Sequence, residues 1–242
     1  MLLFRNLIKN IAFNILHQRQ QRGFHLMNDL IFWSRKKPIE IIFDVGANIG
    51  QTVIEIKQYF PQARVEAFEP IESTFLQLQK NCSGLPNVTL NKFAFGSKPS
   101  QITIELNEES LVNSMLNTVH NSALQVQSKK IQEVRIDTID DICRIKGIKR
   151  INLLKTDTEG YDLEVLKGAK SMLQENKIDF ILSEATFDPT DKTHTYFCEL
   201  NEYLYEHGYK AVGFYDICHT AGSKPSIWYC NVLYANGNLS II

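Results

Sequence analysis

The feature that most constrains the fold is a short apolar segment that runs directly into a glycine-containing turn. Residues 39–45 predict a buried parallel strand, because they are rich in β-branched side chains and too few for a helix. Gly46 permits a tight turn, and a helix is expected over 50–60, ending before Pro61. The free N–H groups and the positive dipole at the start of such a helix suit a carboxylate or a phosphate. This unit predicts an α/β fold with a ligand site at the turn.

Further strands and helices alternate along the chain. The predicted strands cover 64–68, 87–93, 151–156 and 179–183, the predicted helices cover 73–82 (with Ser73 as a possible N-cap), 162–175 and 194–207, and a short helix begins at 138–144. Two half-exposed strands, 101–106 and 133–136, interrupt the alternation, and 209–215 with 227–235 form a closing antiparallel pair. Such alternation predicts a parallel sheet whose ligands bind beyond the carboxyl ends of the strands.

The N-terminal part of the chain differs from the rest. The 242 residues suit one large α/β domain over 39–242, preceded by a helical extension over 1–38. Residues 1–15 are apolar at helical spacing but lack the unbroken run of a signal peptide or a membrane span. The helix over residues 1–15 is expected to cap the domain, with a membrane-surface helix and a homodimer contact as the alternatives. A second helical stretch is expected near 29–36. A cytoplasmic protein is expected.

Charge and cysteine content narrow the function classes. Lys and Arg number 26, Asp and Glu number 27, and the formal net charge is −1. The chain therefore lacks the basic face that nucleic-acid binding requires. Its five cysteines contain no CxxC pair and are odd in number, which indicates free thiols rather than a disulfide framework or zinc site.

Carboxylates follow several of the predicted strands. Glu69 ends the second strand, where a carboxylate can accept hydrogen bonds from both ribose hydroxyls of an adenosyl group. Asp157 and Glu159 follow the strand 151–156, and Glu184 follows the next strand. Asp157 and Glu184 are candidates for a general base or, tentatively, for Mg²⁺ ligands. For Glu159 and Asp157, an ion-pair network with Lys155 is the structural alternative.

The combination of these motifs resembles the FkbM-type methyltransferase family. The segments FDVGANIGQT, AFEP, RIDTIDD and INLLKTDTEGYDLEVLKGA carry the resemblance, which spans about residues 41–184. It implies a class I methyltransferase fold, Rossmann-like, with a seven-stranded, mostly parallel sheet of order 3-2-1-4-5-7-6 whose last strand is antiparallel. It also implies S-adenosylmethionine as methyl donor and O-methylation of a small molecule, a sugar or a lipid or natural-product scaffold.

The resemblance also implies roles for individual residues. The methionine end of the cofactor would be lined by Asp44, Gly46, Asn48 and Gly50, with Gln51 and Thr52 holding its carboxylate. Glu69 would bind the ribose, and the turn Lys92 to Ala94, with Phe93, would lie near the adenine. Asp157 would face the methyl group, and Asn113, Ser114 and Glu159 would contact the acceptor.

His194 is a third candidate for the catalytic base. It lies in the polar segment FDPTDKTHT, and loops of this kind often carry binding residues. Two other functions stay open at this point: an NAD(P)-dependent oxidoreductase and a non-catalytic cofactor-binding or interaction module. The first is disfavoured by Asn48, which stands where a dinucleotide fingerprint requires glycine.

Overall fold

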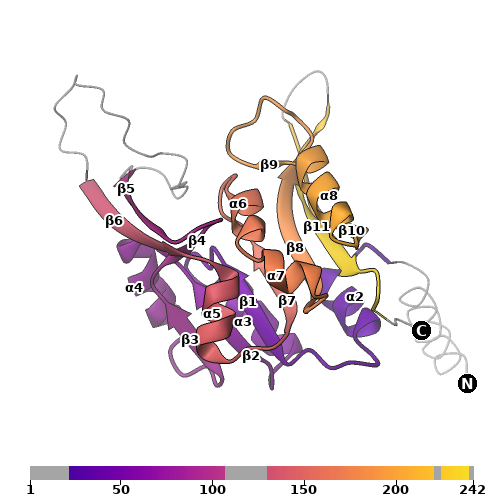
Figure 1. Cartoon of the computed structure of the whole chain (residues 1–242), viewed down its shortest axis with the longest axis horizontal. Coiled ribbons are helices and arrows are strands. Elements are labelled where there is room, and N and C mark those ends of the chain that lie inside the picture. Colours follow the sequence, from indigo (N-terminus) through magenta and orange to yellow (C-terminus); the bar gives the residue numbers. More distant parts are fainter. Residues whose placement is uncertain (1–21, 107–129, 221–224, 240–242) are drawn as a thin grey trace, which may run out of the picture.

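The computed structural model describes residues 22–106, 130–220 and 225–239. They form three layers, in which a central sheet lies between two layers of helices (Figure 1). The strands of this sheet are β1 (Ile41–Val45), β2 (Arg64–Phe68), β3 (Val88–Asn91), β7 (Ile151–Thr156), β8 (Ile178–Thr186), β9 (Thr195–Tyr196), β10 (Tyr209–His219) and β11 (Ile227–Asn236). The described helices are α2 (Leu26–Trp33), α3 (Gln51–Tyr59), α4 (Glu72–Asn81), α5 (Ile139–Lys146), α6 (Asp162–Lys167), α7 (Lys170–Gln174) and α8 (Phe197–Glu206).

The strand order confirms the predicted topology. The sheet runs β10-β11-β8-β7-β1-β2-β3, and β9 pairs with β8. The pairs from β8 through β3 are parallel, and β11 is antiparallel to both of its neighbours. Counting the seven long strands along the chain gives 3-2-1-4-5-7-6 with the last strand antiparallel, as in class I methyltransferases. The sheet has one strand more than predicted, because β9 adds two residues beside the end of β8.

The two half-exposed strands belong to a separate small sheet. Its order is β4-β6-β5, with β4 (Ala94–Phe95), β5 (Ser100–Leu106) and β6 (Lys130–Asp137). Gln132 of β6 accepts a hydrogen bond from the Glu72 backbone N–H at 2.9 Å and donates one to the Pro70 carbonyl at 2.7 Å. The small sheet therefore holds the segment that follows β2, which borders the site described below.

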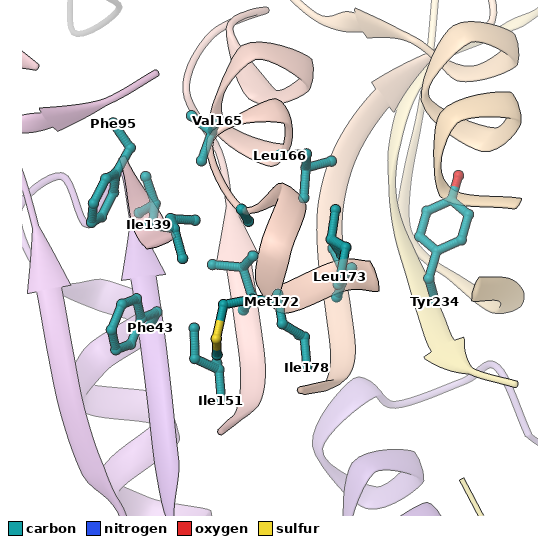
Figure 2. Close-up of a cluster of buried hydrophobic side chains, with 14 of the residues drawn as sticks. Phe43, Phe95, Ile139, Ile151, Val165, Leu166, Met172, Leu173, Ile178 and Tyr234 are labelled. Atoms are coloured by element: carbon teal, nitrogen blue, oxygen red, sulfur yellow. The ribbon is translucent and has the colours of Figure 1, made fainter. Parts of the chain in front are cut away.

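Both faces of the main sheet are buried, which explains the unbroken apolar runs of its strands. Phe43 of β1 belongs to the cluster beneath α5, α6, α7 and α8, whereas Ile42 belongs to the cluster beneath α2, α3 and α4. Figure 2 shows the first cluster, where Ile139 of α5 and Leu173 of α7 lie over the strands. Each fully buried side chain of this size stabilises the fold by roughly 1.5–3 kcal/mol relative to exposure.

The predicted helix 162–175 is two helices. The break comes at Gly168, whose carbonyl accepts a hydrogen bond from the Asp140 backbone N–H of α5 at 3.0 Å. The Asp140 carboxylate in turn accepts from the backbone N–H groups of Ser171 at 2.8 Å and Met172 at 3.1 Å, in the first turn of α7. A residue distant in the sequence thus supplies the cap of α7, and the local pattern does not contain that information.

Three local predictions are wrong. Ser73 is not an N-cap, because α4 begins at Glu72 with Ile71 in the cap position. The strand predicted over 87–93 ends at Asn91. The helix predicted from His194 begins three residues later at Phe197, since β9 pairs with the end of β8 before the helix starts.

The described part of the N-terminal extension packs on the domain. Met27 and Leu30 of α2 are buried in the same cluster as the helices α3 and α4. The carboxylate of Asp29, also in α2, accepts hydrogen bonds from the Tyr215 hydroxyl of β10 at 2.8 Å and from the Gly23 N–H at 2.6 Å. The predicted cap concerned the helix over residues 1–15, which lies outside the described residues. Among the described helices none is long and apolar enough to cross a bilayer.

Candidate active site

A pocket lies where the parallel strands β1, β2 and β7 end. Its walls come from these strands, from the start of α4 and from the turn between β3 and β4. The lining residues are Val45, Gly46, Asn48, Phe68, Glu69, Pro70, Ile71, Thr74, Phe93, Ala94, Phe95, Asp157, Thr158 and Glu159. The position at the carboxyl ends of the strands is the one expected for a ligand site in an open α/β sheet.

Gly46 forms the floor of the pocket and has no room for a side chain. Its φ of +78° lies in the left-handed region, and a methyl group at this position would come within 1.8 Å of the Asp157 carbonyl oxygen. The two strand ends are also tied directly, because the Asp157 N–H donates to the Val45 carbonyl at 3.0 Å. The glycine predicted from the sequence is therefore what allows the ends of β1 and β7 to meet.

Gly50 places the start of α3. Its φ is +96°, and a methyl group there would lie 2.7 Å from the Cys82 sulfur and 2.9 Å from Leu78 Cδ1. Gln51 and Thr52 follow in the first turn of α3 but do not line the pocket. Their roles as carboxylate ligands stay predictions.

Glu69 is held at the pocket wall by two backbone amides. Its Oε2 accepts from the Asn48 N–H at 3.1 Å and its Oε1 accepts from the Ile71 N–H at 2.9 Å. The side chain is nearly buried. Burial raises the pKa of Glu69 to about 7, against the lowering effect of the two amides. Both carboxylate oxygens are thereby fixed in orientation before any ligand arrives.

A buried lysine connects two of the predicted site residues. Lys155 Nζ lies 3.3 Å from Asp44 Oδ1 and 3.1 Å from Asp157 Oδ2. Burial favours the neutral amine, but Asp157 and Asp44 outweigh it and raise the pKa of Lys155 above its usual value. Asp44 itself is fully buried and is not part of the pocket lining. The ion-pair network with Lys155 that was considered for Asp157 is thus present in the structure, and it also includes Asp44.

Glu184 lies on the strand next to Asp157, as predicted, but inside β8 and not after it, because β8 continues to Thr186. The register of β7 and β8 pairs Thr156 with Ser183, so the next residue of each strand falls at the same level. Burial and, to a smaller extent, the carboxylates of Asp157 and Asp162 raise the pKa of Glu184 to about 8. The end of β8 is therefore a site where a proton is readily held.

His194 completes this side of the site. Its Nε2 lies 3.5 Å from Glu184 Oε2, and its Nδ1 lies 2.7 Å from Asp191 Oδ2. The imidazole stacks on the ring of Tyr229, with 4.4 Å between ring centroids, and meets Trp228 edge-on. The ring is only 8% exposed. The structure therefore brings His194 to Glu184, although it places the residue in a loop instead of a helix.

Several contributors were not found from the sequence. Asp191 is the main one on the acceptor side, and its only sequence signal is a spacing of three residues from His194. On the cofactor side, Ile71 and Thr74 line the pocket because they follow Glu69 closely. Asn113 and Ser114 lie outside the described residues.

A metal ion receives no support from the geometry. Within the ranges that the structure describes, no three His, Cys, Asp or Glu side chains are grouped so that they could bind one ion. The tentative Mg²⁺ assignment to Asp157 and Glu184 therefore rests on the sequence alone.

Curated proteins with related sequences are methyltransferases. Methyltransferase 1 of Beauveria bassiana is 28% identical over 52% of this chain and 57% of its own length. The hexuronic acid methyltransferase AglP of Haloferax volcanii is 27% identical over 64% of this chain and 60% of its own. The 2-O-methyltransferase NoeI of Sinorhizobium fredii is 24% identical over 62% of this chain and 64% of its own length. The chain thus matches less than two thirds of each relative.

The profile of the methyltransferase FkbM domain matches residues 44–211. That span is more than half of the chain and runs from the last residues of β1 into β10. It contains the glycine turn, Glu69, Asp157, Glu184 and His194. The protein belongs to the FkbM methyltransferase family.

Proposed function

We propose that the protein transfers a methyl group from S-adenosylmethionine to a hydroxyl oxygen of a sugar-type small molecule. The observation that carries the proposal is the carboxylate of Glu69, held by two backbone amides on the wall of the pocket at the ends of β1 and β2. In this fold a carboxylate at that position accepts hydrogen bonds from the two ribose hydroxyls of an adenosyl cofactor.

The residues present fit such a cofactor. Gly46 lines the pocket without a side chain, so a ligand can approach the backbone closely at this turn. Ile71, Phe93 and Ala94 supply apolar surface for an adenine ring. Asp157, which also lines the pocket, would supply a carboxylate to the positively charged sulfonium of the cofactor.

S-adenosylmethionine supplies a methyl group on a sulfonium, which is already a good leaving group. The protein must therefore align the acceptor hydroxyl and remove its proton. Alignment is worth up to roughly 7–11 kcal/mol, and a positioned base adds about 10²–10⁴-fold in rate. Asp157, Glu184 and His194 gather beside the pocket, so all three are candidates for this work.

Two relatives support a sugar acceptor. The names of the Haloferax and Sinorhizobium proteins specify a hexuronic acid and a 2-O position. Trp228, whose indole is 45% exposed beside His194, is suited to stacking against a sugar ring. Neither feature distinguishes a charged from a neutral sugar, so both belong in the test.

The test is a calorimetric titration with S-adenosylmethionine, using NADH as the comparison ligand. We expect binding of S-adenosylmethionine alone. Glu69→Gln removes a charged hydrogen-bond acceptor worth about 1.5–3 kcal/mol, so affinity should fall roughly 10- to 150-fold. Glu55→Gln, an exposed position on α3, serves as the matched control and should leave affinity unchanged.

Methyl transfer is then assayed with methyl glycosides of glucuronic acid and of neutral hexoses. Formation of S-adenosylhomocysteine that depends on the glycoside supports the proposal. A protein that binds NADH and not S-adenosylmethionine would contradict it. Binding without turnover of any hydroxyl compound would favour a non-catalytic module.

A further inference from the structure

The loop after β8 contains two aspartate turns built in the same way. Asp188 Oδ1 accepts from the Thr190 N–H at 2.8 Å and from its hydroxyl at 2.7 Å. Asp191 Oδ1 accepts from the Thr193 N–H and hydroxyl, both at 2.7 Å. In both turns the loop geometry therefore uses only one oxygen of the carboxylate.

Asp188 and Asp191 differ in what their second carboxylate oxygen contacts. Oδ2 of Asp191 lies 2.7 Å from Nδ1 of His194 and accepts a hydrogen bond from the Trp228 indole N–H at 3.1 Å. Within the described part of the chain, the side-chain hydrogen bonds of Asp188 go only to Thr190. Asp191 thus makes contacts that the turn itself does not require.

These contacts determine which imidazole nitrogen carries a proton. Partial burial opposes ionisation, but hydrogen bonds from Thr193 and His194 hold the pKa of Asp191 down at about 2. An ionised carboxylate only accepts hydrogen bonds, so Nδ1 of His194 must be the protonated nitrogen. In the neutral imidazole, Nε2 then has a free electron pair.

The surroundings keep Nε2 aimed at the site. The imidazole lies flat on Tyr229, with 16° between the ring planes, and is edge-on to Trp228. Nε2 points toward Glu184, 3.5 Å away, at the end of the strand beside Asp157. The ring is almost buried, so flipping would break the contact to Asp191 without a replacement in this loop.

We propose that Asp191 is a positioning residue that fixes the His194 tautomer, and that Nε2 of His194 accepts the proton of the acceptor hydroxyl. The inference rests on the methyl transfer proposed above. As the hydroxyl oxygen attacks, its proton passes to Nε2 and its electron pair forms the new O–C bond. The electrons of the S–C bond remain on sulfur. The imidazolium that results donates from Nδ1 to the ionised carboxylate of Asp191, which stabilises it.

The tautomer is tested directly in the full-length protein. With ¹⁵N-labelled histidine, NMR at neutral pH distinguishes a protonated from an unprotonated ring nitrogen, and His194→Gln assigns the signals. We expect a protonated Nδ1 and an unprotonated Nε2 in the native protein. Asp191→Asn should shift the equilibrium away from this form, whereas Asp188→Asn, which alters the matched turn, should not.

Activity provides the second readout. Asp191→Asn should lower kcat about 100-fold with the glycosides that support turnover, while affinity for S-adenosylmethionine stays unchanged. Asp188→Asn should stay within about 3-fold. Asp191→Glu keeps an ionised carboxylate and should retain the tautomer, which covers the case in which the asparagine variant does not fold.

The outcomes separate the two proposals. If S-adenosylmethionine binds but His194 carries its proton on Nε2, or if Asp191→Asn leaves the tautomer unchanged, the role of Asp191 is wrong and methyl transfer stands. If S-adenosylmethionine does not bind, methyl transfer fails and the role of His194 in it fails with it, whatever its tautomer.

Discussion

The site has two halves that are built in different ways. In the cofactor half, at the ends of β1 and β2, the contacts run through the backbone: Gly46 against the Asp157 carbonyl, and Glu69 against two amides. In the acceptor half, beside β8, the contacts join side chains from different segments. There Asp191 meets His194 and Trp228, and His194 meets Glu184.

This difference indicates that the two halves meet different requirements. The cofactor half must be rigid, whereas the acceptor half must be adapted to its acceptor. Because the contacts in the cofactor half involve the backbone, few residue types are allowed there. A side chain at Gly46, for example, has no space. Side chains in the acceptor half can change one at a time while β8 and β11 keep their pairing. Such an arrangement suits a family in which one donor serves many acceptors.

The largest effect should come from Gly46→Ala. The added methyl group would contact the Asp157 carbonyl at 1.8 Å, and the backbone has a φ of +78°. We expect destabilisation of about 4 kcal/mol or more, measured by urea unfolding, and loss of S-adenosylmethionine binding. Gly84→Ala is the control, because its φ is +80° but nothing lies within 4 Å. It should cost only about 1–2 kcal/mol. Equal losses in the two variants would show that the close approach is not the cause.

Lys155 bridges Asp44 and Asp157, and the loss of its charge should have the next largest effect. Lys155→Met leaves Asp44 and Asp157 facing each other without a cation, and removal of one partner from a buried ion pair typically costs about 3–5 kcal/mol. Because Asp157 is partly exposed, we expect about 3 kcal/mol by urea unfolding. Asp44→Asn in the same background should recover part of this loss. If it recovers nothing, the two residues are not coupled.

A pH titration tests the cofactor half alone. Burial raises the folded-state pKa of Glu69 to about 7 from an ordinary value of 4.5. The stability that this group contributes is therefore full below about pH 4.5 and is lost as the pH rises through 7. Ribose hydroxyls donate to the ionised form, so affinity for S-adenosylmethionine should fall by up to about tenfold between pH 7 and 6. The same titration on Glu69→Gln should be flatter, and a native protein with pH-independent affinity would refute the assignment.

The smallest effect should come from Trp228→Phe in the acceptor half. This change removes the indole N–H that donates to Asp191 and keeps an aromatic ring. We expect destabilisation of about 1 kcal/mol and unchanged affinity for S-adenosylmethionine. Trp228→Ala also removes the ring, and its KM for a glycoside should be higher than that of Trp228→Phe. Equal KM values for the two variants would show that the exposed ring does not contact the acceptor.

The amino-acid sequence by itself determined the backbone frame of the cofactor half. The apolar run of β1, the glycine at position 46 and the acid at position 69 are local features, and each follows from backbone geometry that only certain residues allow. The alternation of strands with helices predicted a parallel sheet, and the order of the long strands came from the family resemblance. These inferences succeeded because they concern neighbours in the chain.

Only the tertiary structure decided the acceptor half and several helix boundaries. Asp140 caps α7 from a distant helix, and β9 delays the start of α8 by pairing with β8. Trp228 reaches Asp191 because β11 pairs with β8, although 37 residues separate the two in sequence. Contacts of this kind depend on strand pairing and packing between remote segments, and no local periodicity or propensity encodes them.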